Sequence, residues 1–410
     1  MIRCQSADQV GATLRFASEQ SLGVSLRGSG HSYIAAPLQN HTLLIDLGGM
    51  NDITVNRQAQ RAVAGPGVRG GRLLPALAHH GLAFPIGHCE DVALGGYLLA
   101  GGLGWNSGAW GPACLHVEAA DVVLADGRLL HVTEHEHPEI LWAVRGAGCA
   151  FFAVVVAYHL RLEPMPAHVH VWSGTFCLSA ASQVAPWLDQ AIAAAPPGLE
   201  LTCMIGPDFE TGKPAISLRA IGIADTAEYA RATVADFIVP PADASMIHAG
   251  KQHRSHFMDL PRLSVMPSNK RVAADQCWSD HPLGDLLLAV CDLAAVPDAP
   301  SSINLVVQGG HGRIPRMPDP GTAALSVGGG VSAGIYAMWD DERDDARHCE
   351  WVQRADVALA PFACGRYVGE ADLHAAPDRL RECFNTAAWE RLSDLRATYD
   401  PVGLIRGLAE

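Results

Sequence analysis

The sequence predicts an α+β protein of two or three domains, and three observations support this. The chain has 410 residues, and domains average roughly 150 residues, so a single ordinary core is too small for it. Hydrophobic residues make up 49% of the chain and charged residues 18%, which allows a large core and excludes wholesale disorder. Short β-branched runs alternate with helical patterns up to residue 164, as in α+β and α/β domains.

This alternation predicts that residues 1–164 form the first part of the fold. Its expected elements are a helix over 7–20, strands over 23–27 and 43–47, and two hairpin arms over 119–124 and 129–133. Asp126 and Gly127 lie between those arms and form a pair that is typical of tight turns. Pro164 and Pro166 close the region.

The composition changes after residue 164, which predicts a second, sheet-containing domain over 165–364. Its strand-like stretches are 168–172, 200–204, 303–308 and 335–339, and its helical stretches are 179–195 and 226–237. The acidic run 340–345 is interpreted as a solvated helix start, because metal ligands need converging geometry, and no metal site is expected. Residues 365–410 form a last segment, with one amphipathic helix predicted over 378–398.

Charge and cysteine usage restrict the partners and the compartment. The 29 Lys and Arg residues against 43 Asp and Glu residues give a formal charge of −14, so no nucleic-acid or membrane partner is expected. The 11 cysteines are odd in number and lack paired short spacings, which fits a reducing, cytoplasmic location. The most apolar run, 149–160, is about half a membrane span, so we expect no targeting or membrane segment.

One motif points toward a nicotinamide cofactor. Gly65, Gly67 and Gly70 spell GxGxxG between a short apolar run and a helical stretch. Pro66, Pro75 and the lack of a following strand with a terminal acidic residue argue against a dinucleotide site there. A nicotinamide-linked dehydrogenase is therefore kept only as an alternative.

Two other segments are rich in glycine and suit close backbone approach to a ligand. Residues 27–30 follow a predicted strand and offer a guanidinium and a run of N–H groups, a combination that suits a pyrophosphate. Residues 87–111 hold more glycines than a connecting loop needs. Taken alone, His31 is equally a loop histidine with a local hydrogen bond, and Cys89 a small buried hydrophobe.

Several separate motifs together resemble one family. They are VSLRGSGHSY at 24–33, PIGHCEDVALGG at 85–96, GGLGW at 101–105, ADVV at 120–123, ADG at 125–127, LWAVRG at 141–146 and YDP at 399–401. In this order they resemble the berberine bridge enzyme-like oxidases of the vanillyl-alcohol oxidase superfamily. The resemblance implies a PCMH-type FAD-binding domain in two parts, 1–164 and 365–410, around a central substrate domain, 165–364, built on an antiparallel sheet flanked by helices.

The resemblance also implies the cofactor and its contacts. FAD is expected to be bound covalently, through His31 to the flavin 8α-methyl group and through Cys89 to C6, because a thiolate or neutral imidazole can attack an electrophilic flavin. The other residues expected to bind FAD are Arg27, Gly28, Ser29, Gly30, Ser32, Gly87, Val92, Gly95, Gly96, Gly101, Gly102, Gly104, Trp105 and Val154.

The implied reaction is hydride transfer from a small alcohol, sugar or natural-product substrate to flavin N5, with dioxygen as the acceptor. Glu370 occupies the position of a catalytic base, although a solvated glutamate at a loop edge fits the sequence equally. Tyr33 either orients the substrate or packs in the core. Tyr367 is the third expected catalytic residue, with packing between the domains as its alternative role.

Two departures from the family pattern suggest another function. Phe152 and Gly369 stand where the family has Gly and Asn, so the flavin contacts are in doubt. The alternative is a degenerate member that acts as a non-redox flavin-binding scaffold or cyclase. The sequence sets neither the substrate, the electron acceptor nor the oligomeric state.

Overall fold

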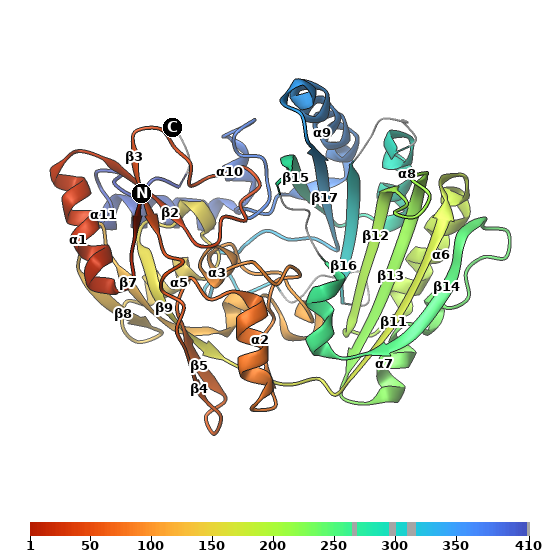
Figure 1. The fold of residues 1–410 in the computed structure, drawn as a ribbon, viewed down its shortest axis with the longest axis horizontal. Helices are drawn as coiled ribbons and strands as arrows, with labels where there is room; N and C mark the ends of the chain where they lie inside the picture. Colours follow the sequence, from red (N-terminus) through yellow and green to blue (C-terminus); the bar gives the residue numbers. More distant parts are fainter. Residues whose placement is uncertain (265–268, 295–300, 310–316, 408–410) are drawn as a thin grey trace.

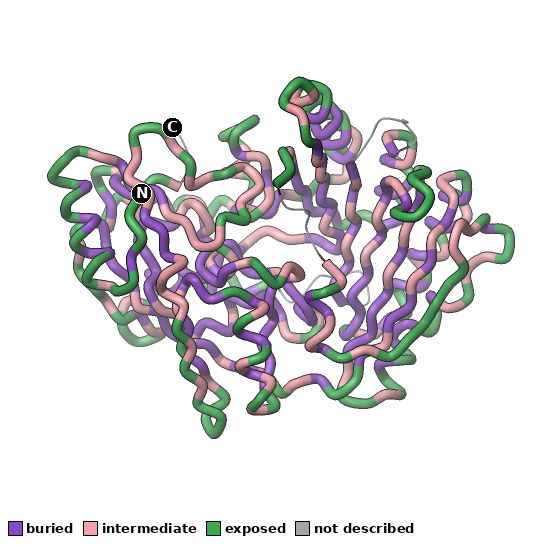
Figure 2. The backbone as a smooth tube through the Cα atoms, viewed as in Figure 1, coloured by how far each residue is buried: buried purple, intermediate pink, exposed green. Residues whose placement is uncertain are grey.

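The computed structural model describes residues 1–264, 269–294, 301–309 and 317–407, and it contains two regions of different architecture. Sheets of three, five and two strands with their helices form one side of the molecule, and a broad eight-stranded sheet forms the other (Figure 1). Buried residues follow the sheets and their helix-covered faces, and exposed residues gather in the outer loops and helix surfaces (Figure 2). The predicted α+β class is confirmed.

The N-terminal sheet has three parallel strands in the order β1 (Ile2–Arg3), β3 (Thr42–Asp46) and β2 (Gly23–Arg27). Helix α1 (Ala7–Glu19) begins after Ser6, whose hydroxyl accepts a hydrogen bond from the Gln9 N–H and so caps the helix. Its apolar face, with Val10 and Leu14, packs into a core beneath this sheet. The predicted helix and both predicted strands are confirmed here.

The second sheet has five antiparallel strands. Their order is β4 (Ile53–Asn56), β5 (Arg61–Ala64), β9 (Val154–Arg161), β7 (Val117–Val123) and β8 (Leu129–Thr133). Strands β7 and β8 form the predicted hairpin, and Gly127 in its turn has a φ of +83°, a conformation that suits glycine.

Short elements connect and cover this sheet. They are α2 (Gly70–Ala78), β6 (Leu82–Ala83), α3 (Leu94–Leu99), α4 (Ser107–Trp110), α5 (Pro138–Val144) and β10 (Glu163–Pro164). The segment with GxGxxG does not form a dinucleotide fold, because β5 pairs antiparallel with β4 and with β9. Its glycines serve close packing instead: a Cβ on Gly65 would lie 2.2 Å from the Met50 carbonyl oxygen, and one on Gly67 2.6 Å from that of Leu47.

The eight-stranded sheet is antiparallel. Its order is β14 (Met246–Ser255), β11 (His168–Cys177), β13 (Pro214–Ala224), β12 (Leu199–Pro207), β16 (Ser302–Gln308), β17 (Val331–Trp339), β15 (Arg271–Ser279) and β18 (Ala363–Gly365). Helices α6 (Ala181–Ala194), α7 (Ala227–Thr233), α8 (Leu283–Ala294) and α9 (Asp345–Leu359) pack against it. All four strands predicted in this part are confirmed, and each is longer than predicted.

The C-terminal segment corrects one prediction. In place of one helix over 378–398, there are two, α10 (Arg379–Glu382) and α11 (Thr386–Tyr399). Asn385 lies between them, and its side chain accepts a hydrogen bond from the Ala388 N–H at 2.8 Å, so it starts a new helix. Beyond α11 the chain reaches the N-terminal sheet, where Ile405 pairs with Val24.

No helix among the described residues is long and apolar enough to cross a membrane. The division of the chain at residues 164 and 364 remains a prediction.

Candidate functional site

A cavity of about 1560 Å³ lies between the glycine-rich N-terminal segments and one face of the eight-stranded sheet. Its lining comes mainly from residues 26–37, 87–103, 148–158, 367–373 and 405–407, and from strands of the sheet. Pockets for a single small molecule measure about 300–1,000 Å³. The cavity therefore has room for a cofactor and a substrate together.

The sheet side of the cavity follows from the alternation of side chains along its strands. On β12, Leu201 and Cys203 are buried against the helices, whereas Thr202 and Met204 line the cavity. Strands β16 and β17 repeat this pattern. Their lining side chains are Ser302, Asn304, Val306, Gln308, Ser332, Tyr336 and Met338. These lining side chains are uncharged, and the neighbouring strands add two charged ones, Arg219 on β13 and Lys251 on β14.

The loop after β2 forms an anion cradle at the other side. Gly30 has a φ of +85°, and the Ser29 hydroxyl accepts a hydrogen bond from the Ala93 N–H at 2.9 Å, which joins this loop to the second glycine-rich segment. Within the described part of the chain, the N–H groups of Gly30 and His31 donate no hydrogen bond. Free N–H groups on a glycine loop suit a phosphate or pyrophosphate. The predicted pyrophosphate loop thus has the donors that FAD requires.

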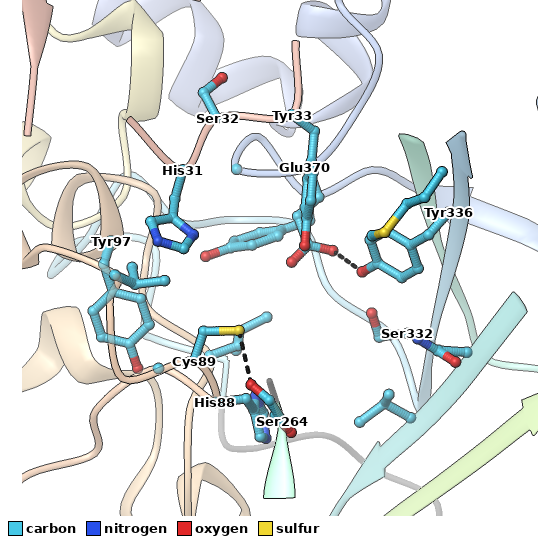
Figure 3. Close-up of a pocket in the computed structure, with 18 of the residues that line it drawn as sticks. His31, Ser32, Tyr33, His88, Cys89, Tyr97, Ser264, Ser332, Tyr336 and Glu370 are labelled. Carbon is cyan, nitrogen blue, oxygen red and sulfur yellow. Dashed lines mark hydrogen bonds between the residues drawn. The ribbon is translucent and has the colours of Figure 1, made fainter. Parts of the chain in front are cut away.

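His31 and Cys89 approach one space from these two segments (Figure 3). The pKa of His31 is lowered from its ordinary value, first because the surrounding chain removes part of its solvent. Its imidazole is therefore neutral near pH 7, the form that acts as a nucleophile. The Cys89 thiol is partly buried and donates a hydrogen bond to the Ser264 carbonyl oxygen at 3.2 Å.

Glu370 borders the same space together with two tyrosines (Figure 3). The Tyr336 hydroxyl donates a hydrogen bond to Glu370 Oε2 at 2.7 Å, and the rings of Tyr33 and Tyr336 lie 5.3 Å apart. Burial raises the pKa of Glu370, and the Tyr336 hydrogen bond and His88 oppose that rise. Glu370 is thus a cavity carboxylate and not a solvated loop residue. The sequence reasoning did not single out Tyr336.

A second polar group was also missed. His88 Nε2 lies 3.5 Å from Glu200 Oε2, and its ring meets the edge of Trp105 at 4.4 Å between centroids. Glu200 is 4% exposed and accepts hydrogen bonds from the Asn106 N–H at 2.7 Å and from Gln308 Nε2 at 3.3 Å. This carboxylate holds the His88 ring at the cavity wall. The only signal for this pair in the sequence is a glutamate within a mainly apolar strand. That signal does not identify His88, 112 residues away in the chain, as the partner of Glu200.

Tyr367 lines the cavity but is 8% exposed and firmly held. Its hydroxyl accepts a hydrogen bond from the Gly102 N–H at 3.3 Å, and its own N–H donates to Gln276 Oε1 at 2.7 Å. Its ring lies edge-on to Trp278 at 6.1 Å. These contacts join the glycine-rich segment to β15, which agrees with the packing role that was its alternative.

Most of the predicted cofactor residues lie on the cavity wall. They are Gly28, Ser29, Gly30, His31, Ser32, Gly87, Cys89, Val92, Gly95 and Gly96. Six predicted residues do not line it: Arg27, Gly101, Gly102, Gly104, Trp105 and Val154.

The six residues make other contacts, and their role in binding FAD remains a prediction. Arg27 pairs with Asp46 at 3.0 Å and faces a separate, smaller pocket. Gly101, Gly102 and Gly104 allow tight packing, since a Cβ on Gly104 would lie 2.0 Å from the Ile86 carbonyl oxygen. Trp105 and Val154 are buried in the core. Their neighbours Leu103, Ala153 and Val155 reach the cavity in their place.

The two departures from the expected pattern leave the cavity open. Phe152 is fully buried and stacks on Tyr399 at 5.4 Å, away from the cavity lining. Gly369 lines the cavity, and a Cβ there would lie 2.8 Å from the Tyr367 ring. Phe152 therefore does not block a ligand, and glycine suits the space at position 369.

Comparisons with known proteins agree with this geometry. A family profile described as an FAD binding domain matches residues 1–133. The chain is 25% identical to an FAD-linked oxidoreductase of Hypoxylon pulicicidum over 415 residues, which cover 100% of this chain and 90% of that protein.

Solved structures share the fold at lower identity. 6-Hydroxy-D-nicotine oxidase from Arthrobacter nicotinovorans matches with a TM-score of 0.83 at 21% identity, over 100% of this chain and 90% of that one. Berberine bridge enzyme from Eschscholzia californica matches with a TM-score of 0.83 at 18% identity, over 99% of this chain and 88% of that one. The overall fold is thus common to all three.

Proposed function

We propose that the chain is a berberine bridge enzyme-like FAD-linked oxidase with FAD attached covalently through both His31 and Cys89; its FAD-binding profile match, its likeness to FAD-linked oxidoreductases and its shared fold support this. The proposed substrate is a small alcohol, sugar or natural product, and the proposed electron acceptor is dioxygen. Bound FAD supplies the hydride acceptor, and its reoxidation by dioxygen gives hydrogen peroxide.

The observation that carries the proposal is the meeting of His31 and Cys89 at one cavity from two glycine-rich segments. A neutral imidazole and a thiol are the two side-chain nucleophiles that this attachment needs. The lowered pKa of His31 favours its neutral form. The N–H groups of Gly30 and His31 supply pyrophosphate donors beside them.

Glu370 is the proposed base that removes the proton from the substrate hydroxyl or amine. The Tyr336 hydroxyl supports its charged form by donating to Oε2. Tyr33 stands against the Tyr336 ring, so we propose that it orients the substrate from the loop that carries His31. Tyr367 is proposed to position the segment of Glu370. Its hydroxyl and its N–H bond to other segments, and its carbonyl oxygen accepts a hydrogen bond from the Glu370 N–H at 3.0 Å.

His88 is a second proposed contact for the substrate. Glu200 fixes its ring, and the ring lies near enough to Glu370 to lower the pKa of that carboxyl. A substrate between the two would meet a base on one side and an imidazole hydrogen-bonding group on the other. Both groups are directed into the cavity from different parts of the fold.

The hydroxyl-bearing side chains on the cavity face of the sheet support a substrate with several hydroxyl groups. Thr175, Thr202, Ser217 and Ser332 offer hydroxyls on the cavity side of the sheet. Asn304 Oδ1 is buried there without a hydrogen-bond partner in the described part of the chain. An unpaired buried acceptor costs about 1–3 kcal/mol unless a ligand pairs with it. A hydroxyl of a sugar or alcohol would meet this need.

Acid denaturation tests the attachment. The protein is precipitated in acid, and the flavin absorbance and intact mass of the pellet are recorded for the wild type, His31→Ala, Cys89→Ala and the double variant. Cys349→Ser, which changes an exposed thiol on α9, is the matched control. We expect FAD mass in each single variant and in the control, and its loss only in the double variant.

Turnover separates an oxidase from the alternative, a non-redox scaffold or cyclase. The yellow holoenzyme is given a panel of primary alcohols, aldoses, oligosaccharides and cyclic amines, and peroxide release is measured. Peroxide formation with one class supports the oxidase. Unmodified, colourless protein after expression with ample FAD would overturn the covalent attachment, and yellow protein without reduction by any class would favour the scaffold.

A further inference from the structure

Outside the cavity lining, two histidines and an aspartate form a compact group on the five-stranded sheet. Asp121, His131 and His159 each offer one ligand atom, and these atoms all lie within 4.8 Å of one another. In the described ranges this is the one group of three histidine, cysteine or carboxylate side chains with such spacing. None of the three lines the cavity, so the proposed oxidase does not account for them.

The sheet itself brings the three side chains together. Asp121 on β7 lies directly opposite His131 on β8, and His159 on β9 lies opposite Ala119, two residues before Asp121. Residues two apart on a strand share a face, and directly paired residues share it too. All three side chains therefore extend from the same face of three neighbouring strands. Positions on strands hold ligand geometry better than positions on loops.

The distances are close to those around a metal ion. Asp121 Oδ1 lies 2.6 Å from His131 Nδ1, and Asp121 Oδ2 lies 3.3 Å from His159 Nε2. The two rings lie 5.0 Å apart, edge to face. Four ligands at about 2.0–2.1 Å from a tetrahedral Zn²⁺ are roughly 3.3 Å from each other. The separations of the ligand atoms in the group, all within 4.8 Å, bracket this value.

The electrostatic surroundings also suit a cation. Within the described residues, Asp121 forms ion pairs with these two histidines and with no lysine or arginine. The side chains of Asp121, His131 and His159 are 30%, 48% and 32% exposed, so an ion can enter from solvent. No basic side chain of an ion pair has to be displaced.

We propose that Asp121, His131 and His159 bind a divalent transition-metal ion, with Zn²⁺ as the preferred ion. Two imidazole nitrogens and one carboxylate oxygen match the ligands of Zn²⁺, whereas Mg²⁺ and Ca²⁺ take oxygen ligands. Three protein ligands leave a fourth position for water. The ion joins β8, an edge strand of the sheet, to β7 and β9, and its role is to hold that edge in place.

Metal titration tests the site. The FAD-containing holoenzyme, free of any affinity tag and treated with a chelator, is titrated with Zn²⁺ by calorimetry, and the Co²⁺ form is examined for the visible absorption of a tetrahedral site. We expect one Zn²⁺ per chain with a dissociation constant on the order of 1 μM, and a higher thermal midpoint when Zn²⁺ is present.

Conservative variants identify the ligands. Asp121→Asn, His131→Gln and His159→Gln are each expected to weaken Zn²⁺ binding by at least about tenfold and to abolish the Zn²⁺-dependent rise of the thermal midpoint. Asparagine keeps an oxygen for the histidine hydrogen bonds, so this variant retains the fold. His170→Gln, which changes a histidine on β11 that bonds Gln252, and Cys349→Ser are the controls and should bind as the wild type does.

Two outcomes would overturn the proposal. Absence of stoichiometric Zn²⁺ uptake would leave the group as a hydrogen-bonded His-Asp-His cluster. Uptake that persists unchanged in the three ligand variants would place the ion elsewhere. Flavin content and peroxide release are measured on the same samples. Failure of the metal site can therefore be distinguished from failure of the proposed oxidase.

Discussion

Two groups of buried charge lie at the two ends of one short segment, residues 366–370, and they are built differently. At one end, Arg366 forms ion pairs with Asp275 at 3.1 Å and with Asp356 at 2.9 Å, and Arg379 pairs with both of these carboxylates. At the other end, Glu370 has one hydrogen bond to a protein side chain, from Tyr336. Its remaining surface faces the cavity.

The difference separates a structural ion-pair network from a reactive group. We call the network of Arg366 and Arg379 with Asp275 and Asp356 the brace; the reactive group is Glu370. Arg366 is 8% exposed, and its pKa is raised because the carboxylates around it outweigh its burial. Such a group fixes the chain and offers nothing to a ligand. The pKa of Glu370 is raised by burial that its partners do not offset, which leaves it able to exchange a proton. The brace holds the segment that presents the proposed base.

The largest expected effect concerns the reactive end. Replacing Glu370 with Gln keeps the shape but removes the base, so flavin reduction by the best substrate of the panel should slow by about 10²- to 10⁴-fold. Stopped-flow absorbance measures this rate, and the flavin spectrum and thermal midpoint should stay near those of the wild type. A fall of less than tenfold would remove Glu370 from the reaction.

A substitution in the brace should instead lower the free energy of unfolding. Arg366→Met leaves two buried carboxylates with one fewer partner, so the free energy of unfolding should fall by about 3–5 kcal/mol. Urea unfolding of the holoenzyme measures it. Arg343→Ala, which breaks a pair with Asp341 on an arginine that is 85% exposed, is the control and should leave the free energy of unfolding nearly unchanged, because exposed ion pairs contribute little. Equal losses in both variants would contradict the comparison.

The Tyr336→Phe variant tests whether the pKa of Glu370 sets the pH dependence of activity. The Tyr336 hydroxyl donates to the Glu370 carboxylate and so lowers its pKa. Because the base must be charged, activity rises with pH through the pKa of Glu370, above the ordinary value of about 4.3. The variant should move this limb to higher pH and slow reduction by about 2- to 10-fold at neutral pH. A limb that stays fixed or moves to lower pH would mean that Glu370 does not set it.

The sequence predicted the strands of the cavity better than the cavity itself. Residues 200–204 and 303–308 were recognised as strands because their β-branched and apolar residues are dense. The alternation that places Thr202 and Asn304 on the cavity side is visible in the same letters, but only the fold shows which face meets a cavity. Phe152 illustrates the reverse: its identity put a flavin contact in doubt, and the structure places its side chain in the core.

Contacts between distant segments set the rest. The hydrogen bond of Tyr336 to Glu370 and the pairing of His88 with Glu200 join residues 34 and 112 positions apart. Local pattern cannot supply such partners, because they depend on how β12 and β17 stack beside the loops. The loops carrying His31 and Cys89 were predictable because their glycines and order resemble a family, and the roles of both residues remain a proposal.

The smallest expected effect concerns the helices next to the brace. Here the structure has two helices, α10 and α11, in place of the one predicted over 378–398. Asn385 starts α11 shortly after the end of α10, the helix that carries Arg379, which pairs with Asp275. Asn385→Ala removes the cap of α11 and should lower the free energy of unfolding by about 1 kcal/mol. Asp378→Ala is the matched control, since Asp378 precedes α10 without a capping hydrogen bond. If Asn385→Ala also slows flavin reduction at saturating substrate, the brace and the base are coupled more tightly than their separate hydrogen bonds indicate.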